Sequence, residues 1–182
     1  MQNYIAPSFA DYLRQELKGL AQKNPKSVDL ENGTKFNYRN QNDPNGSDSG
    51  MLDIFFAENL IPEISDINQG KLIQILRNVT GQEIIPIRAN AYLNNGIKNT
   101  RTYHIDNAQP VIYKAFIYLS DVPNISYGPY SFIRRSHRFS CYTYLNLFIN
   151  IFKTTPSTNM PIYRNSRIED AIGEKGDLIL SN

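Results

Sequence analysis

Two side chains that can bind a metal ion stand two positions apart in the sequence Arg-Thr-Tyr-His-Ile-Asp-Asn, namely His104 and Asp106. In an extended strand, side chains two residues apart point to the same side, so this imidazole and this carboxylate can reach one ion. A histidine and a carboxylate, completed by a second histidine from elsewhere, form the ligand triad of non-haem Fe(II) centres. The pair alone is a weak signal, because a histidine inside a sheet can simply be a hydrogen-bonded structural residue.

An ordered set of short motifs follows this pair. The alternating run at 111–119 leads into Ser-Asp-Val-Pro at 120–123, and it is followed by Gly-Pro-Tyr at 128–130, Ser-His-Arg at 136–138 and Gly-Asp at 176–177. The order resembles that of the phytanoyl-CoA dioxygenase-like branch of the Fe(II)/2-oxoglutarate-dependent dioxygenases. The resemblance extends over residues 84–182, about half of the chain.

The resemblance implies a site and a reaction. His104 and Asp106 would bind Fe(II), 2-oxoglutarate would be the cosubstrate, and the product would be a hydroxylated small organic or lipid-like molecule. Lys114 stands mid-strand among apolar residues, so a lysine pointing inward there could hold the tail of 2-oxoglutarate. Tyr92 and Tyr103 could donate phenol hydrogen bonds to the cosubstrate. For the two tyrosines, packing in the core is the alternative, since a chain with 12 tyrosines places many of them there.

Parts of the chain depart from the family pattern. Arg134 and Arg135 stand where the family has Pro-Gly, and the histidine that follows there, His137 here, is not a metal ligand in the family. The family's second metal histidine and its anion-binding arginine or lysine come after the Gly-Asp strand, whereas this sequence ends at Asn182. Two interpretations stay open. One is an oxygenase of this type, either a fragment with impaired activity or a protein with an unusual site; the other is a non-catalytic jelly-roll protein for binding or assembly. Whether the chain is an enzyme is therefore left open.

The apolar pattern predicts a mainly β fold with flanking helices, of the α+β class. A helix should begin near Ser8, which can cap it, and end before Pro25. The other expected elements are helices within 51–78 broken near Pro62 and Gly70, strands at 82–93, 110–119, 130–133 and 178–180, and a helix that starts at Ser136 or Ser140 and runs to Phe152; the segment 168–172 is ambiguous.

The family resemblance implies that the strands form a double-stranded β-helix, or jelly roll, that is incomplete at its C-terminal end. We expect a single domain, in which residues 1–80 are mainly helical and residues 81–182 form a jelly-roll core without the family's last strands. An open sheet edge presents unpaired backbone groups, so it could join two copies into a homodimer.

Composition and charge narrow the expected partners and compartment. Twelve Tyr and nine Phe without Trp favour sheet, and a small formal net charge of +2 predicts neither nucleic acid nor a membrane as partner. The family resemblance implies a small-molecule substrate. The single cysteine, Cys141, predicts a buried or partly buried thiol in a reducing compartment. The N-terminus lacks a signal-peptide pattern and the apolar run at 142–152 is too short to cross a bilayer, so a cytoplasmic protein is expected.

Overall fold

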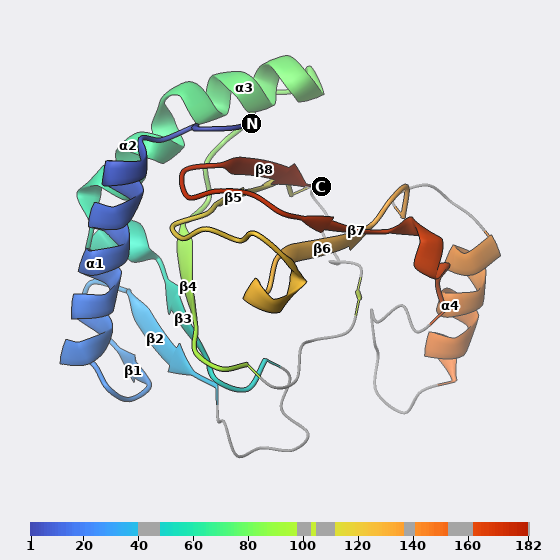
Figure 1. The fold of residues 1–182 in the computed structure, drawn as a ribbon, viewed down its shortest axis with the longest axis horizontal. Helices are drawn as coiled ribbons and strands as arrows, with labels where there is room; N and C mark the ends of the chain where they lie inside the picture. The colour runs from blue at the N-terminus through green and yellow to red at the C-terminus, as the bar shows by residue number, and fades with distance from the viewer. Residues whose placement is uncertain (40–47, 98–102, 105–111, 137–140, 153–161, 182) are drawn as a thin grey trace. The chain divides into compact units, whose positions relative to one another are not determined.

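The computed structural model describes residues 1–39, 48–97, 103–104, 112–136, 141–152 and 162–181 (Figure 1). The chain divides into two compact units. We call Met1–Gln15 with Thr102–Asn182 the terminal unit, and Glu16–Arg101 the central unit. Each unit contains helix and antiparallel sheet, so the predicted α+β class is confirmed. Among the helices that the structure describes, none has the length and apolar character that crossing a membrane requires.

The central unit contains a four-stranded antiparallel sheet. Its strands lie in the order β1 (Val28–Asp29), β2 (Lys35–Tyr38), β3 (Met51–Phe55) and β4 (Asn90–Asn94). Alternation along β3 sends Leu52 and Ile54 to one side of the sheet and Asp53 to the other, and all three are buried. Leu52 lies opposite Tyr38 and Ile54 opposite Phe36, so the apolar side of the sheet is continuous across β2 and β3.

Three helical segments follow β3 in the central unit. They are the 3₁₀ turn η1 (Ala57–Asn59), α2 (Pro62–Gln69) and α3 (Lys71–Thr80). Leu72, Ile73 and Leu76 of α3 are buried and share one face of the helix. The predicted breaks near Pro62 and Gly70 are confirmed, since α2 begins at the proline and the glycine separates the two helices.

Two sequence predictions for this unit were wrong in part. The segment 51–55 is a strand instead of the start of a helix, because its backbone pairs with β2 on one side and β4 on the other. The predicted strand at 82–93 begins only at Asn90, after Pro86, which lacks the N–H that a paired strand needs. Short apolar runs have the same composition in helices and in strands, and only the presence of pairing partners shows which of the two forms.

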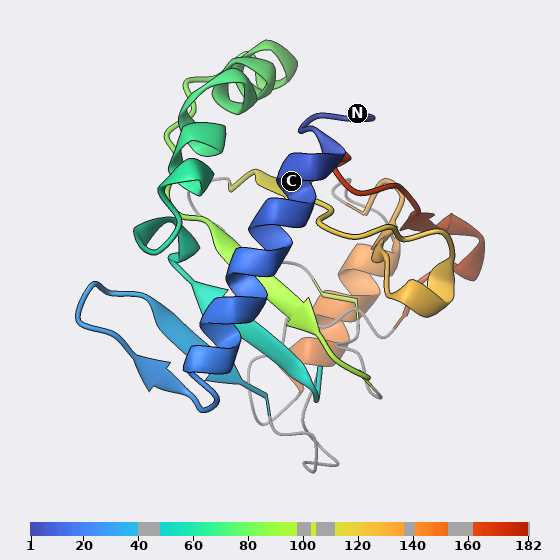
Figure 2. The same ribbon diagram turned by 60° about the vertical axis from the view of Figure 1, so that its left-hand side comes forward.

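Helix α1 (Pro7–Lys23) confirms the first predicted helix and its end before Pro25. It begins at Pro7 instead of being capped by Ser8, since proline has the helical φ angle and its missing N–H costs nothing in the first turn. In the central unit, the hydroxyl of Tyr38 is shared between the carbonyl oxygens of Ala21 and Asn24, at 3.0 and 2.8 Å, and this fastens β2 to the end of α1. Figure 2 shows the C-terminal end of α1 beside the first strands of the sheet.

The terminal unit contains two separate two-stranded antiparallel sheets (Figure 1). Strand β5 (Lys114–Ile117) pairs with β8 (Leu178–Ser181), and β6 (Tyr130–Ile133) pairs with β7 (Ile168–Ala171). In the sequence, both strands of the β6–β7 pair therefore lie between β5 and β8, so the two pairs are nested. The predictions of β5, β6 and β8 are confirmed, and the ambiguous segment is β7. Also in this unit are the 3₁₀ turns η2 (Ile125–Tyr127) and η3 (Asn165–Arg167) and the predicted helix α4, now defined as Cys141–Ile151.

Tyr118, which follows β5, joins the two strand pairs. Its hydroxyl donates to the carbonyl oxygen of Ala171 at 2.7 Å and accepts the N–H of Tyr130 at 2.9 Å, so both hydrogen-bonding capacities are used. Next to it, the rings of Phe116 and Tyr130 stack with centroids 4.4 Å apart. The Tyr130 hydroxyl lies 2.8 Å from the hydroxyl of Ser181 on β8. Burial raises the pKa of Tyr118, so the phenol keeps the proton that this arrangement needs.

The turn before β8 requires the Gly-Asp sequence that was noted as a motif. Gly176 has a φ angle of +92°, and a Cβ atom there would collide with the carbonyl oxygen of Ile5. The carboxylate of Asp177 accepts the N–H groups of Asn3 at 2.8 Å and Glu174 at 3.0 Å. The motif therefore has a structural role in forming this turn, whatever else it does.

Tyr118→Phe should test the joint between the strand pairs. The substitution removes the oxygen shared by the Ala171 carbonyl and the Tyr130 N–H, so we expect the free energy of unfolding to fall by about 1–3 kcal/mol. Urea denaturation followed by circular dichroism measures this. Tyr127→Phe, at a tyrosine that is 60% exposed, is the control and should change stability by less than about 0.5 kcal/mol. Equal effects of the two substitutions would contradict the assigned role.

Candidate functional site

His104 lies in the terminal unit, at a single-residue β-bridge, and its side chain is half-buried. A bridge at one residue does not test the predicted strand, because residues 105–111 lie outside those that the structure describes. Asp106 and His137 lie outside the residues that the structure describes. The convergence of His104 and Asp106 on one point therefore stays a prediction.

Tyr103, next to His104, belongs to a cluster of side chains that we call the Tyr103 cluster, made of Tyr103, Ser131, Tyr163 and Asp170. Ser131 and Asp170 face each other across β6 and β7, and the serine hydroxyl donates to the aspartate at 2.5 Å. The Tyr103 ring meets Tyr163 edge-to-face with centroids 5.0 Å apart. Burial raises the pKa of Tyr103, Asp170 and Tyr163 add to the rise, and a hydrogen bond with Ser131 offsets part of it. These contacts hold the backbone of the residue beside His104.

Lys114, the predicted partner of the 2-oxoglutarate tail, is the first residue of β5 and is half-buried. It pairs with Ser181 of β8, and alternation places it on the same side of the strand as Phe116. Phe116 stacks on Tyr130 of β6, so this side of β5 faces the other strand pair. The location agrees with an inward-pointing lysine, and its proposed role stays a prediction.

Tyr92, the other predicted cosubstrate ligand, lies on β4 in the central unit, with 48% of its surface exposed. It stands opposite Asp53 on β3, and the side-chain amide of Asn90 lies 3.5 Å from its hydroxyl. Tyr92 and the His104 segment thus belong to different compact units.

Sequence reasoning missed a buried charge in the central unit. Asp53 is fully buried, and its Oδ2 accepts Nε of Arg39 at 2.9 Å and the amide of Asn37 at 3.1 Å. Arg39 also binds Asp48 through its terminal nitrogen, at 2.6 Å. The other oxygen of Asp53, Oδ1, has no hydrogen-bond partner among the described residues. An aspartate between Leu52 and Ile54 was the available signal, but it has this meaning only if the segment is read as a strand.

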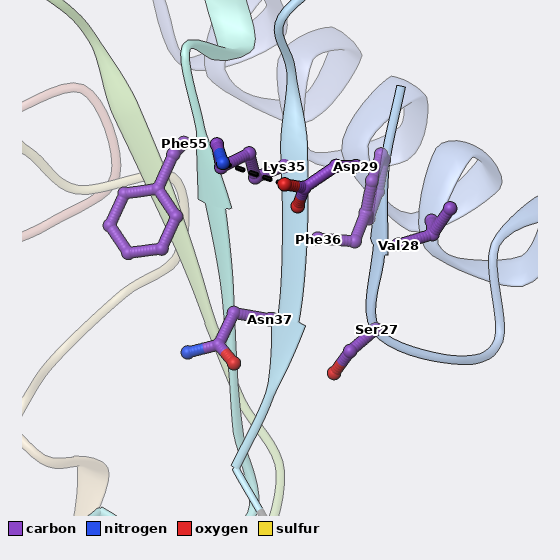
Figure 3. A pocket seen from close by; sticks show the side chains of 7 residues that line it. All are labelled: Ser27, Val28, Asp29, Lys35, Phe36, Asn37 and Phe55. Atoms are coloured by element: carbon purple, nitrogen blue, oxygen red, sulfur yellow. Dashed lines mark hydrogen bonds and ion pairs between the residues drawn. The ribbon is translucent and has the colours of Figure 1, made fainter. Parts of the chain in front are cut away.

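A hollow of about 370 Å³ opens beside strand β1 in the central unit (Figure 3). It is lined by Ser27, Val28, Asp29, Lys35, Phe36, Asn37 and Phe55. Asp29 and Lys35 form an ion pair across it at 2.6 Å, although their side chains are 69% and 50% exposed. Because its two charged groups neutralise each other in solvent, the hollow offers little specific attraction to a ligand.

Within the described parts of the chain, no three histidine, cysteine, aspartate or glutamate side chains are close enough to hold a metal ion. Described residues alone therefore do not make a complete iron site. Comparisons with protein families, curated proteins and solved structures found no match for this chain. The chemical assignment depends on the residues themselves and on the motif order.

Asp53→Asn should be strongly destabilising. The substitution removes the charge that Arg39 pairs with inside the protein, so we expect unfolding to become easier by about 3 kcal/mol or more. Asp29→Asn, which breaks an exposed ion pair, is the matched control and should cost no more than about 1 kcal/mol. Chemical denaturation of both variants at neutral pH decides the matter, and similar losses would refute the structural importance of the buried pair.

The raised pKa of Tyr103 predicts a pH dependence of stability. A tyrosine with a higher pKa in the folded state stabilises the fold below its unfolded pKa of about 10, and this contribution is lost as pH rises through the folded value. Tyr103→Phe should therefore destabilise the protein more at pH 7.5 than at pH 10.5, as measured by urea midpoints at both pH values. A stability difference that stays constant with pH would contradict this.

Proposed function

We propose that the terminal unit is the first part of a jelly roll of the phytanoyl-CoA dioxygenase-like type, and that His104 and Asp106 bind Fe(II) in it. The nested pairing of β5 with β8 around β6 with β7 is the observation that carries the proposal. A long hairpin that folds over on itself gives this pattern, and jelly rolls are built in that way as two facing sheets. The stacked Phe116 and Tyr130 rings are what two facing layers would bury between them.

The turn after β6 gives independent support. Arg135 stands where the family pattern has the glycine of Pro-Gly, and it has a φ angle of 63°, in the left-handed region that glycine enters at no cost and other residues rarely adopt. An arginine in this conformation is consistent with a backbone turn that keeps the family's shape after the glycine has been replaced. The neighbouring Arg134 forms an ion pair with Glu169 on β7, which helps to hold the turn on the sheet.

The Tyr103 cluster favours an inward direction for His104. Tyr103 contacts Ser131 and Asp170, and adjacent side chains of an extended segment point to opposite sides. Ser131 and Tyr130 are adjacent on β6, so their side chains point to opposite sides of the strand, and the Tyr130 ring lies on the side that faces Phe116. His104 would then be directed toward the space between the strand pairs. In this proposal Tyr103 is a positioning residue for the histidine instead of a ligand of the cosubstrate.

The residues available fit an iron site only in part. His104 and Asp106 can supply two protein ligands, and water would fill the positions that a second histidine occupies in a facial triad, which loosens the hold on the metal. When bound, iron with 2-oxoglutarate supplies the oxidising chemistry for hydroxylating an unreactive carbon. Lys114, on the Phe116 side of β5, would bind the far carboxylate of 2-oxoglutarate by charge.

A second function is favoured by one observation. The chain has only two histidines, and no group of three metal-binding side chains occurs in its described parts. A jelly-roll protein that binds or assembles without catalysis would need neither iron nor 2-oxoglutarate. The two functions differ in what His104 does, and that difference can be measured.

Metal binding should depend on His104 and Asp106 and not on His137. Anaerobic titration with Fe(II), or with Co(II) as a spectroscopic substitute, should give at least about tenfold weaker binding in His104→Ala and Asp106→Ala than in the wild type. His137→Ala removes the only other histidine and serves as the control, with unchanged affinity. With 2-oxoglutarate and dioxygen, the wild type should form succinate slowly and His104→Ala none.

The outcomes separate the two proposals. Metal binding that is lost in His104→Ala, together with succinate formation, supports the oxygenase. A folded wild-type protein that neither binds the metal nor forms succinate refutes the oxygenase and favours the non-catalytic protein. Weakened binding in His137→Ala would instead mean that the metal pair has been wrongly assigned.

A further inference from the structure

Helix α4 in the terminal unit presents an apolar face to the outside. The helix has no charged residue. With about 3.6 residues per turn, its exposed side chains fall on one face that continues into the next residue. These side chains are Tyr144 (63% exposed), Leu145 (47%), Phe148 (60%), Ile151 (75%) and Phe152 (72%). The rings of Phe148 and Phe152 meet edge-to-face, with centroids 4.8 Å apart, and make the face continuous.

Asn146, on the opposite side of α4, is turned toward the protein. Asn146 is buried, and its amide donates to the carbonyl of Ile162 at 2.6 Å while its oxygen accepts the N–H of Ile162 at 2.9 Å. The same amide also contacts the carbonyl of Tyr142 at 2.8 Å. A helix on the surface of a water-soluble core normally shows the reverse arrangement, with apolar residues inward. A continuous exposed apolar face of this kind marks an interaction surface.

The sequence around α4 is strongly basic, which the small net charge of the chain conceals. Between Asp121 and Glu169 there is no acidic residue, whereas there are six lysines and arginines. The rest of the chain has 13 basic and 17 acidic residues, a formal charge of −4. Four of the six basic residues lie in described segments, and they are Arg134, Arg135, Arg164 and Arg167.

These arginines gather near α4. The N–H of Arg134 donates to the carbonyl of Arg167 at 2.8 Å, at the point where β6 ends and β7 begins. Arg164 is two residues after Ile162, whose backbone is held by Asn146 of α4. Arg134 is paired with Glu169, while Arg135 and Arg164 are both exposed. The apolar face and a basic cluster therefore belong to one region of the terminal unit.

We infer that this region docks on the surface of an anionic lipid membrane, with α4 lying in the interface. An apolar face beside arginines matches acyl chains beside anionic headgroups. A second copy of the chain fits less well, because two identical basic clusters would repel each other. Single-stranded nucleic acid would satisfy the arginines and stack on aromatic rings, but it would leave the aliphatic Leu145 and Ile151 without an apolar partner.

Cys141 supplies a reporter for this surface. It is the only cysteine in the chain and lies exposed on α4, which corrects the expectation of a buried thiol. An environment-sensitive fluorophore attached there should brighten and shift to the blue when vesicles containing phosphatidylserine are added at physiological salt, and not with phosphatidylcholine alone. A fluorophore on Val79→Cys in a Cys141→Ser background should not respond, since residue 79 is an exposed position on α3 in the central unit.

Two variants test the two components of the surface. Phe148→Asp with Ile151→Asp should abolish vesicle binding in co-sedimentation, and Arg135→Glu with Arg164→Glu should weaken it at least about tenfold. All four side chains are exposed, so thermal melts should match that of the unlabelled wild type.

Four outcomes would overturn the inference. They are the absence of binding to phosphatidylserine vesicles, binding that survives the double aspartate substitution, self-association of the wild type that this substitution removes, and binding of a single-stranded oligonucleotide that displaces the vesicles. None of these measurements uses iron or 2-oxoglutarate, so the inference and the proposed function can fail separately.

Discussion

The hydroxyl group of Tyr118 is the contact on which the terminal unit depends most. Each strand pair has only four paired positions, and an isolated two-stranded pair of this length is marginally stable in water, so backbone pairing alone cannot hold the two pairs together. The phenol donates one hydrogen bond to β7 and accepts one from β6, the two strands of the inner pair, while the backbone of Tyr118 extends the outer pair. The backbone of Tyr118 also accepts the N–H of Gly176, so the same residue ties the Gly-Asp turn to the sheet. Tyr118 therefore links the two ladders through both its side chain and its backbone.

The motif residues divide into two groups when their contacts are considered. Gly176, Asp177 and the Arg135 turn have structural reasons for their conformations that require no ligand. His104 and Asp106 are the residues to which the resemblance gives a chemical role. A resemblance carried by turn-forming residues therefore concerns backbone conformation more than chemistry. This is why the metal pair, and not the motif order, must decide between an oxygenase and a binding protein.

The sequence predicted those helices and strands that can be recognised from their own residues, without knowledge of the strands beside them. Alternation identified β5, the short apolar run after the Gly-Asp turn identified β8, and apolar residues spaced along one helical face identified α1. It failed at 51–55, because an apolar run with a single aspartate acquires its meaning from β2 and β4 on either side. Asp53 was missed for the same reason: an aspartate in a helix would be placed on an exposed face, whereas in this strand alternation turns it toward Arg39. Whether this aspartate is buried depends on which strands pair with its segment, and the composition of the segment does not reveal that.

A property averaged over the whole chain conceals local differences in charge. The formal charge of +2 argues against anionic partners only if basic and acidic residues are mixed throughout, whereas the 47 residues from Val122 to Ile168 contain no acidic residue. The apolar character of α4 was visible in the sequence, but its direction was not. Asn146 decides that direction, because its amide satisfies both backbone groups of Ile162, and an asparagine that is bonded inward forces Phe148, two residues further on, to point outward. A single buried amide thereby converts an apolar helix, which would otherwise be assigned to the core, into an exposed surface.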